Sequence, residues 1–211
     1  MLQISEIFYS IQGESTNLGR PCVMIRLTGC NLDRAWCDTR CAMDEGRDMS
    51  LDRVLAEADR TPRPLVEVTG GEPLIQPETP ELISAHFKSG RKVLMETNGA
   101  ADIDRADRRC ARIMDVKCPC GGMADRTDPG NFSRLTERDQ VKFALADRTD
   151  CEFARETIQS RLGKADGGRL LLSPVENRLA PRELAKWMLA DRLDARMQLQ
   201  RHIRPEIERG V

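Results

Sequence analysis

The chain has 211 residues, and its 33 basic and 34 acidic side chains leave a formal net charge of -1. A charge this close to zero provides no basic surface for a nucleic acid or an anionic membrane, and we expect neither as a partner. Hydrophobic residues make up 40% of the sequence and charged residues 32%, which is typical of a globular domain with a sizeable core. Because there is no apolar run of the ~20 residues that span a bilayer and no signal peptide at the N-terminus, we expect a cytoplasmic protein.

The counts of histidine and cysteine narrow the possible chemistry. The two histidines, His86 and His202, are too few for a three-His zinc site, and a Ser/His/Asp triad would have to use one of them. Eight cysteines are many for a chain without an export signal, where disulfides are rare. Metal binding or thiol chemistry is therefore the better interpretation of the cysteines.

Strand-like and helix-like segments alternate after an opening stretch at 4–11. Short runs rich in Val, Ile, Leu or Met predict strands at 22–27, 65–69, 92–96, 112–116, 140–145 and 169–172. Capping residues and breakers predict helices at 50–59, 80–89, 150–162 and 181–191, and a surface loop at 121–131. A strand-then-helix order predicts an α/β fold with a parallel sheet, and both a partial barrel and an open doubly wound sheet fit the pattern. Without a repeat or linker, 1–211 is expected to form a single domain.

Polar residues and glycines follow five of the six predicted strands. In either type of parallel sheet, ligands bind at the carboxyl ends of the strands. The segments concerned are 28–30, 70–73, 96–99, 115–117 and 173–176. Each one alone is ordinary turn chemistry, but five together beside a cysteine cluster favour a site on one rim of the sheet.

The cysteine cluster consists of Cys30, Cys37 and Cys41. Three thiolates in one loop can hold a [4Fe–4S] cluster and leave one iron open to a substrate amine and carboxylate. A zinc knot needs four ligands, and no CxxC pair or nearby histidine completes one. Three unliganded thiols are the remaining alternative. The other cysteines with close spacing, Cys118 and Cys120, and the later Cys151 suggest no second site and are expected to be small buried residues.

The chain also carries, in order, the segments EIFYSIQGE at 6–14, GRP at 19–21, RLTGCNL at 26–32, WCDT at 36–39, VTGGEP at 68–73, ETNG at 96–99 and DVK at 115–117. The GGEP motif alone indicates only the radical SAM superfamily. The Gln-Gly-Glu block together with Cys-Asp-Thr is more specific. Over essentially its whole length, the sequence resembles the 7-carboxy-7-deazaguanine synthase family.

This resemblance implies a fold, a reaction and cofactors. The fold would be a partial (β/α)6 TIM-like radical SAM barrel, with a [4Fe–4S] cluster that reduces S-adenosylmethionine. The resulting radical would take hydrogen from 6-carboxy-5,6,7,8-tetrahydropterin, and ring contraction with loss of ammonia would give 7-carboxy-7-deazaguanine for queuosine biosynthesis. The resemblance further implies Mg²⁺ at the substrate carboxylate, a homodimer, and an electron donor such as a flavodoxin.

The resemblance also implies roles for individual residues. The pterin pocket would be lined by Ile11, Gln12, Gly13, Glu14, Arg26 and Thr69, with the Arg26 guanidinium facing the substrate carboxylate. S-adenosylmethionine would contact Gly71, Asp115, Val116, Lys117, Ser173, Pro174, Val175 and Glu176. Thr39 would ligate Mg²⁺ through its oxygen. The segment 198–205 resembles the family's ending, which helps to close the pocket.

One position departs from the family's Cys-x3-Cys-x2-Cys spacing. Cys30 and Cys37 fill its outer places, but the middle place holds Arg34, whose guanidinium has no lone pair to offer iron. A refolded loop would allow Cys41 to supply the third thiolate. The alternative is a catalytically impaired homologue that keeps the fold and the pterin pocket but lacks a stable cluster. A third alternative is another radical SAM enzyme, such as a glycyl radical activase.

Overall fold

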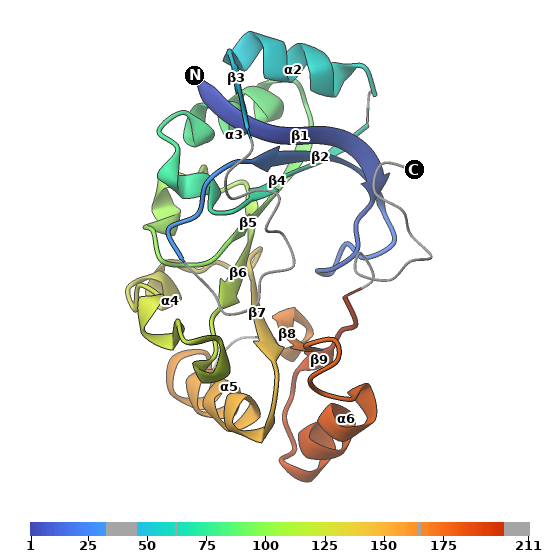
Figure 1. The fold of residues 1–211 in the computed structure, drawn as a ribbon, viewed down its shortest axis with the longest axis vertical. Coiled ribbons are helices and arrows are strands. Elements are labelled where there is room, and N and C mark those ends of the chain that lie inside the picture. Colours follow the sequence, from blue (N-terminus) through green and yellow to red (C-terminus); the bar gives the residue numbers. More distant parts are fainter. Residues whose placement is uncertain (33–45, 62, 164–165, 201–211) are drawn as a thin grey trace.

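The computed structural model describes residues 1–32, 46–61, 63–163 and 166–200. Within these residues one curved sheet runs through the molecule, and Figure 1 shows the helices on its outer side. The strand order in the sheet is β3-β1-β2-β4-β5-β6-β7-β8-β9. None of the helices in these ranges has the length and apolar character needed to cross a membrane.

The strands are β1 (Leu2–Ile11), β2 (Pro21–Leu27), β3 (Arg47–Met49), β4 (Leu65–Gly70), β5 (Lys92–Thr97), β6 (Ala111–Val116), β7 (Gln140–Leu145), β8 (Leu170–Pro174) and β9 (Arg196–Met197). The helices are α2 (Leu51–Asp59), α3 (Thr79–Lys88), α4 (Asn131–Arg134), α5 (Arg148–Arg161) and α6 (Pro181–Ala190). All six predicted strands and all four predicted helices are confirmed, with ends shifted by a few residues at most.

The six predicted strands are β2 and β4 to β8, and neighbouring members of this set pair in parallel. The opening stretch at 4–11 lies within β1, which pairs antiparallel with both β2 and β3. The segment between β5 and β6 contains the short 3-10 helix Ile103–Arg105, so the strand-then-helix alternation is incomplete there. The segment expected as a loop contains the 3-10 helix Ala124–Arg126 and leads into α4. The curved parallel sheet with outer helices is a partial TIM-like barrel.

Local sequence explains where the longer helices begin. The Ser50 hydroxyl accepts a hydrogen bond from the Arg53 backbone at the start of α2, and the Asp147 carboxylate accepts one from Asp150 at the start of α5. Pro181 opens α6, where a missing N–H costs nothing. Each helix turns apolar side chains toward the sheet, as Leu184 does in α6.

A buried ion pair holds the end of the barrel where β6 and β7 begin. Arg112 in β6 is fully buried, and its Nη2 lies 2.6 Å from Oδ2 of Asp139, just before β7. The same guanidinium donates to the carbonyl oxygens of Ile103 and Arg134. These contacts satisfy a charge that would otherwise destabilise the core, and they lie at the end of the strands opposite to the carboxyl rim.

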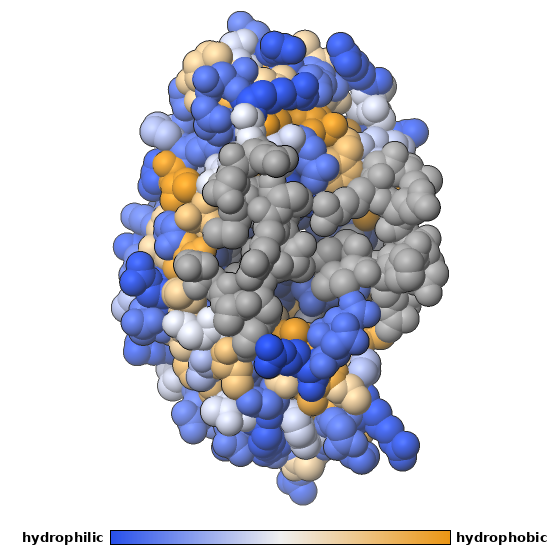
Figure 2. All heavy atoms as spheres, in the orientation of Figure 1, coloured by the Kyte–Doolittle hydropathy of each residue, from blue (hydrophilic) through white to orange (hydrophobic). Residues whose placement is uncertain are grey.

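The outer surface is polar on the face that Figure 2 presents. Hydrophilic residues predominate at its upper and lower ends, and the apolar groups in view are small and separate. This distribution agrees with a sequence in which nearly a third of the residues are charged.

Candidate active site at the carboxyl ends of the strands

Strand register decides which side chains share the inner face of the sheet. Parallel partners point the same way, and side chains alternate along each strand. In the register between β2 and β4, Arg26 lies opposite Thr69. When the register is followed strand by strand across β5, β6 and β7, it places Lys142 on the same face, and it continues in the same way to β8. The face opposite to the helices therefore carries Arg26, Glu67, Thr69, Glu96, Asp115, Lys142 and Ser173. The neighbouring residues Val68, Met95 and Val116 point to the helices and belong to the hydrophobic core.

The two glycines after β4 allow an unusually close approach of two chain segments. A Cβ on Gly71 would lie 2.0 Å from the carbonyl oxygen of Gly29 and 2.8 Å from Cβ of Cys30. Gly70 has φ 142°, and a Cβ there would lie 2.1 Å from the carbonyl oxygen of Leu27. Both positions thus require glycine, and they hold the turn after β4 against the segment that carries Cys30.

Glu72 joins the carboxyl ends of β4 and β5. Its buried carboxylate accepts hydrogen bonds from the backbone N–H of Leu74 at 3.0 Å, the hydroxyl of Thr97 at 2.9 Å and the backbone N–H of Asn98 at 2.7 Å. Burial raises the pKa of this carboxyl, although the hydrogen bonds act against the shift. The GGEP motif is therefore a clamp between neighbouring strand ends.

Asn98 connects Glu72 to Cys30, the first cysteine of the predicted cluster-binding set. Its side-chain amide donates to Sγ of Cys30 at 3.8 Å and to Oδ1 of Asn31 at 2.8 Å. Cys30 is half-buried at the rim, so its sulfur is held in place while it stays accessible. This geometry fits one thiolate ligand of an iron–sulfur cluster, since hydrogen bonds to ligand sulfurs are typical of such sites. The other predicted ligands, Cys37, Cys41 and Thr39, and also Arg34, lie outside the described residues.

A group of acidic side chains lies on the inner face below the rim. The side-chain amide of Gln12 donates to the carboxyl of Glu67, and Oε1 of Gln12 accepts the backbone N–H of Glu14 at 2.5 Å. Burial, followed by repulsion from Glu96 and Glu14, raises the pKa of Glu67 to about 8. Two of the predicted pterin residues, Gln12 and Glu14, therefore contact each other beside a buried carboxyl with a raised pKa.

Lys142 of β7 lies among these acids. Its Nζ is 2.6 Å from Oε2 of Glu14, pairs with Glu96, and is 3.8 Å from Oδ2 of Asp115. Burial alone would lower the pKa of this ammonium group, but the three carboxylates outweigh that effect and hold the pKa well above its ordinary value. Lys142 and Glu67 were not among the predicted site residues. The sequence signal for them is that each is the single charged residue inside its predicted buried strand.

The remaining predicted pterin residues are placed as follows. Nε of Arg26 pairs with Oε1 of Glu6 at 2.6 Å, and its side chain is only 15% exposed. Thr69 is buried beside it in the register. Gly13 is buried between Gln12 and Glu14, whereas Ile11 is exposed at the end of β1. The structure thus gathers Gln12, Gly13 and Glu14 with Lys142, and places Arg26 and Thr69 on the same face.

The predicted S-adenosylmethionine residues lie at the ends of β6 and β8. Lys117 pairs with Asp115, and both are nearly buried. Ser173 is fully buried, and within the part of the chain that the structure describes its hydroxyl has no hydrogen-bond partner. Pro174 and Glu176 line a pocket of about 370 Å³ with Leu199 and Gln200, and the backbone N–H of Val175 donates to the carbonyl oxygen of Leu145. Pro174 and Glu176 of the predicted set therefore line the pocket, whereas Ser173 is buried and is not one of its lining residues.

The last described residues reach back to the turn after β1. The side-chain amide of Gln198 accepts from the backbone N–H of Ser15 at 2.9 Å and donates to its carbonyl oxygen at 2.8 Å. Gln200 donates to Oε1 of Glu14 at 2.6 Å. The segment expected to close the pocket therefore contacts one of the predicted pterin residues directly.

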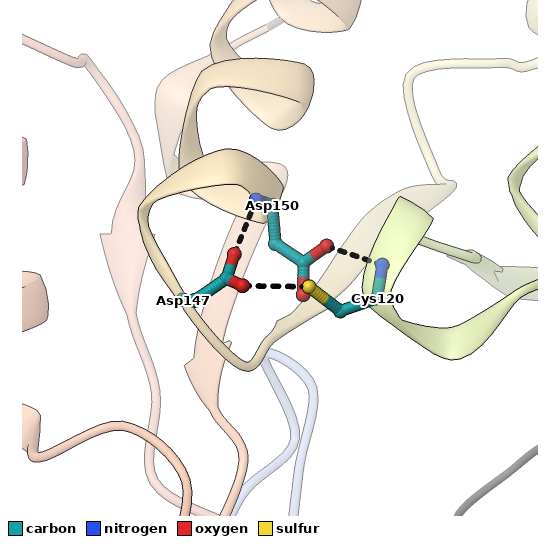
Figure 3. A group of neighbouring side chains, drawn as sticks. All are labelled: Cys120, Asp147 and Asp150. Atoms are coloured by element: carbon teal, nitrogen blue, oxygen red, sulfur yellow. Dashed lines mark hydrogen bonds between the residues drawn. The ribbon is translucent and has the colours of Figure 1, made fainter.

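A second group of side chains of the kinds that bind metals lies at the start of α5, in the loops that follow β6 and β7. Figure 3 shows the side chains of Cys120, Asp147 and Asp150 grouped together, and Sγ of Cys120 lies 2.7 Å from Oδ2 of Asp147. The carboxylate of Asp150 accepts the backbone N–H groups of Cys120 and Ala146, each at 2.9 Å. The hydrogen bond to Asp147 raises the pKa of the Cys120 thiol to about 12. These groups satisfy one another as a helix cap, and Cys120 is half-buried, not fully buried as expected.

Comparison with known proteins agrees with the site. The radical SAM superfamily model matches residues 24–118. The 7-carboxy-7-deazaguanine synthase of Koribacter versatilis is 40% identical, covering 95% of each chain, and that of Chlorobaculum tepidum is 42% identical, covering 95% of this chain and 92% of the relative. A crystal structure of QueE from Escherichia coli has a TM-score of 0.75 at 25% identity, covering 95% of this chain and 94% of that one. A structure of Streptococcus suis SuiB bound to S-adenosylmethionine shares the fold, with a TM-score of 0.55 at 13% identity.

Identity of this extent over nearly the whole chain determines the family, and radical SAM membership implies a [4Fe–4S] cluster and S-adenosylmethionine as cofactors. The rim geometry, the matched superfamily region and the full-length relatives lead to the same assignment. The chain belongs to the 7-carboxy-7-deazaguanine synthase family of radical SAM proteins.

Proposed function

We propose that this protein, as one radical SAM domain over 1–211, converts 6-carboxy-5,6,7,8-tetrahydropterin to 7-carboxy-7-deazaguanine with loss of ammonia, a lyase reaction of queuosine biosynthesis. The observation that carries the proposal is the acidic inner face below the rim that bears Cys30. There Gln12 and Glu14 meet Glu67 and Lys142 in a buried hydrogen-bonded group. Carboxylates of this kind suit a ligand rich in N–H donors, as a pterin is.

Each group of residues would have a separate task in this reaction. When bound, the cluster and S-adenosylmethionine supply the radical that begins the rearrangement. The loop with Cys30, Cys37 and Cys41 would hold the cluster, and the ends of β6 and β8 would hold S-adenosylmethionine. Arg26 would leave Glu6 to pair with the substrate carboxylate, and Thr39 would provide an oxygen for Mg²⁺.

The proposal extends to partners. An external one-electron donor such as a flavodoxin would reduce the cluster, and the active form would be a homodimer. The small-molecule pterin would enter over the rim, where Gln200 contacts Glu14.

A turnover experiment tests the reaction. The protein is reconstituted anaerobically with iron and sulfide, supplied with a reductant, S-adenosylmethionine, Mg²⁺ and the tetrahydropterin, and analysed by mass spectrometry. Formation of 7-carboxy-7-deazaguanine that stops when S-adenosylmethionine is left out is the expected result. Cleavage of S-adenosylmethionine without consumption of the pterin would instead point to another radical SAM reaction.

A second candidate function is a non-catalytic pterin-binding relative, and Arg34 is the observation that favours it. With arginine in the middle ligand place, two thiolates of the usual set remain. In this case the purified protein would bind the pterin but would neither retain iron nor cleave S-adenosylmethionine. Replacing the arginine by cysteine (R34C) would then restore the cluster.

A further inference from the structure

Carboxylates from separate parts of the chain surround the ammonium group of Lys142. Glu14 follows β1, Glu96 belongs to β5 and Asp115 to β6, and all three lie within 4.0 Å of Nζ. The Lys142 side chain is only 4% exposed. One cation in β7 therefore fixes acidic groups that the strands alone would leave to repel one another.

Stability of the fold is a poor explanation for this arrangement. Moving an ammonium group and several carboxylates out of water costs free energy, and well-packed apolar residues in such places are often at least as stable. The register partner of Lys142 in β8, Leu171, lies on the same face and is a fully buried apolar residue, so an apolar side chain is accommodated at this level of the sheet. A charge at this position therefore points to a role for the charge itself.

Lys142 lies closest to the carboxylates of Glu14 and Glu96, and these two differ in how many of their hydrogen-bond acceptor positions other protein groups occupy. Oε2 of Glu14 accepts from Lys142 and Oε1 accepts from Gln200. The Glu96 side chain is 27% exposed, so it retains accessible acceptor positions toward the inner face. A carboxylate that a neighbouring cation fixes in direction is a strong acceptor for the N–H groups of a planar heterocycle.

We propose that Lys142 is a positioning residue for the pterin, because it holds the carboxylates of Glu14 and Glu96 oriented as acceptors for the N–H groups of the substrate. This inference rests on the proposed function and adds to it the residue that orders the acidic half of the pocket. Lys142 acts through the two carboxylates and does not need to touch the substrate itself.

The experiment measures binding of 6-carboxypterin, a fluorescent and unreactive probe, to the reconstituted protein loaded with S-adenosylmethionine. The variants are K142M, E14Q and the double variant, with K92M as a control, because Lys92 lies exposed at the start of β5. K142M and E14Q should each weaken probe binding by about tenfold or more. If Lys142 acts through Glu14, the affinity of the double variant for the probe should be no lower than that of the single variant that binds the probe less tightly.

Two further readouts separate positioning from general damage. The iron content after anaerobic reconstitution should be unchanged in K142M, and K142Q provides a second variant if the methionine impairs folding. Without the cation, the carboxylates of Glu14 and Glu96 lose the group that fixes their direction, so the contacts they offer the substrate should weaken. In turnover, K142M should therefore raise the KM for the tetrahydropterin more than it lowers kcat, whereas K92M should keep the wild-type values.

The outcomes distinguish this inference from the proposed function. Wild-type affinity in K142M and K142Q, or fully additive losses in the double variant, would overturn the role of Lys142 while the pterin site stands. A wild-type protein that binds S-adenosylmethionine but not 6-carboxypterin would overturn the proposed function, and the inference would fall with it.

Discussion

The carboxylate of Glu72 accepts a 2.7 Å hydrogen bond from the backbone N–H of Asn98, and the Asn98 side chain in turn donates to the sulfur of Cys30. The turn after β4, the turn after β5 and the first cysteine are thus connected through two residues. The position of Cys30 therefore depends on a carboxylate that does not touch it.

Replacing Glu72 by alanine tests this connection. The change leaves the Leu74 and Asn98 N–H groups and the Thr97 hydroxyl without their buried acceptor, so the free energy of unfolding should fall by about 3 kcal/mol. Urea denaturation measures the change, and Glu81→Ala on the exposed side of α3 is the control, expected within about 0.5 kcal/mol of the wild type. Equal stability of the two variants would show that the clamp is weak.

Gly71→Ala should displace the segment that carries Cys30, because the new Cβ would lie 2.0 Å from the carbonyl oxygen of Gly29. We expect less iron per chain after anaerobic reconstitution than in the wild type. Gly121→Ala is the matched control, since a Cβ there meets nothing within 4 Å. Undiminished iron in the Gly71 variant would mean that the backbone adjusts at no cost to the site.

The raised pKa of Glu67 predicts that the stability of the fold depends on pH. Its pKa is raised from 4.5 to about 8, so the folded protein holds a proton that the unfolded chain releases. The stabilisation is complete below about pH 4.5 and is lost as the pH rises to about 8. The free energy of unfolding of Glu67→Gln, relative to the wild type, should therefore increase over this range and level off above it. Parallel pH profiles of the two proteins would show that Glu67 ionises normally.

His86 predicts the opposite dependence. It is fully buried in α3, and its two ring nitrogens have no hydrogen-bond partner within the described residues. Burial, followed by the charge of Arg91, lowers its pKa from 6.5 to about 4. Stability from this group is present above about pH 6.5 and is lost as the pH falls toward 4, because the unfolded chain binds the proton more readily.

His86→Leu should abolish this loss in acid and raise the free energy of unfolding at neutral pH by about 1 kcal/mol, since two unsatisfied polar atoms are removed. Chemical denaturation of both proteins at pH values from about 4 to 7 measures the difference. A variant that keeps the acid-dependent loss of the wild type would assign that loss to other groups.

The parallel strands could be predicted because their sequences are short apolar runs bounded by breakers, as in 65–69 and 140–145. The strand β1 was harder to assign, since its burial pattern mixes buried, half-buried and exposed residues along its length. Its ten residues are stabilised by antiparallel pairing with β2 and β3, which depends on contacts distant in the sequence.

The rim of the site could also be predicted, because carboxyl ends of parallel strands meet wherever such a sheet forms. The contact between Glu14 and Lys142 could not, since 128 residues separate them and nothing in either local sequence identifies its partner. The contact of Gln200 with Glu14 joins the two ends of the chain in the same way. Contacts of this kind arise from the closure of the barrel, which local patterns do not encode.

The central claim is that this chain holds a radical SAM cluster although Arg34 occupies the middle ligand place. Iron and sulfide analysis of the anaerobically reconstituted wild-type protein, with its visible absorption spectrum, tests the claim most directly, and a C41S variant is the control. The account predicts about four iron atoms per chain in the wild type and loss of the cluster in C41S. A colourless wild-type protein that holds less iron than one cluster per chain, and that gains a cluster only as R34C, would contradict it.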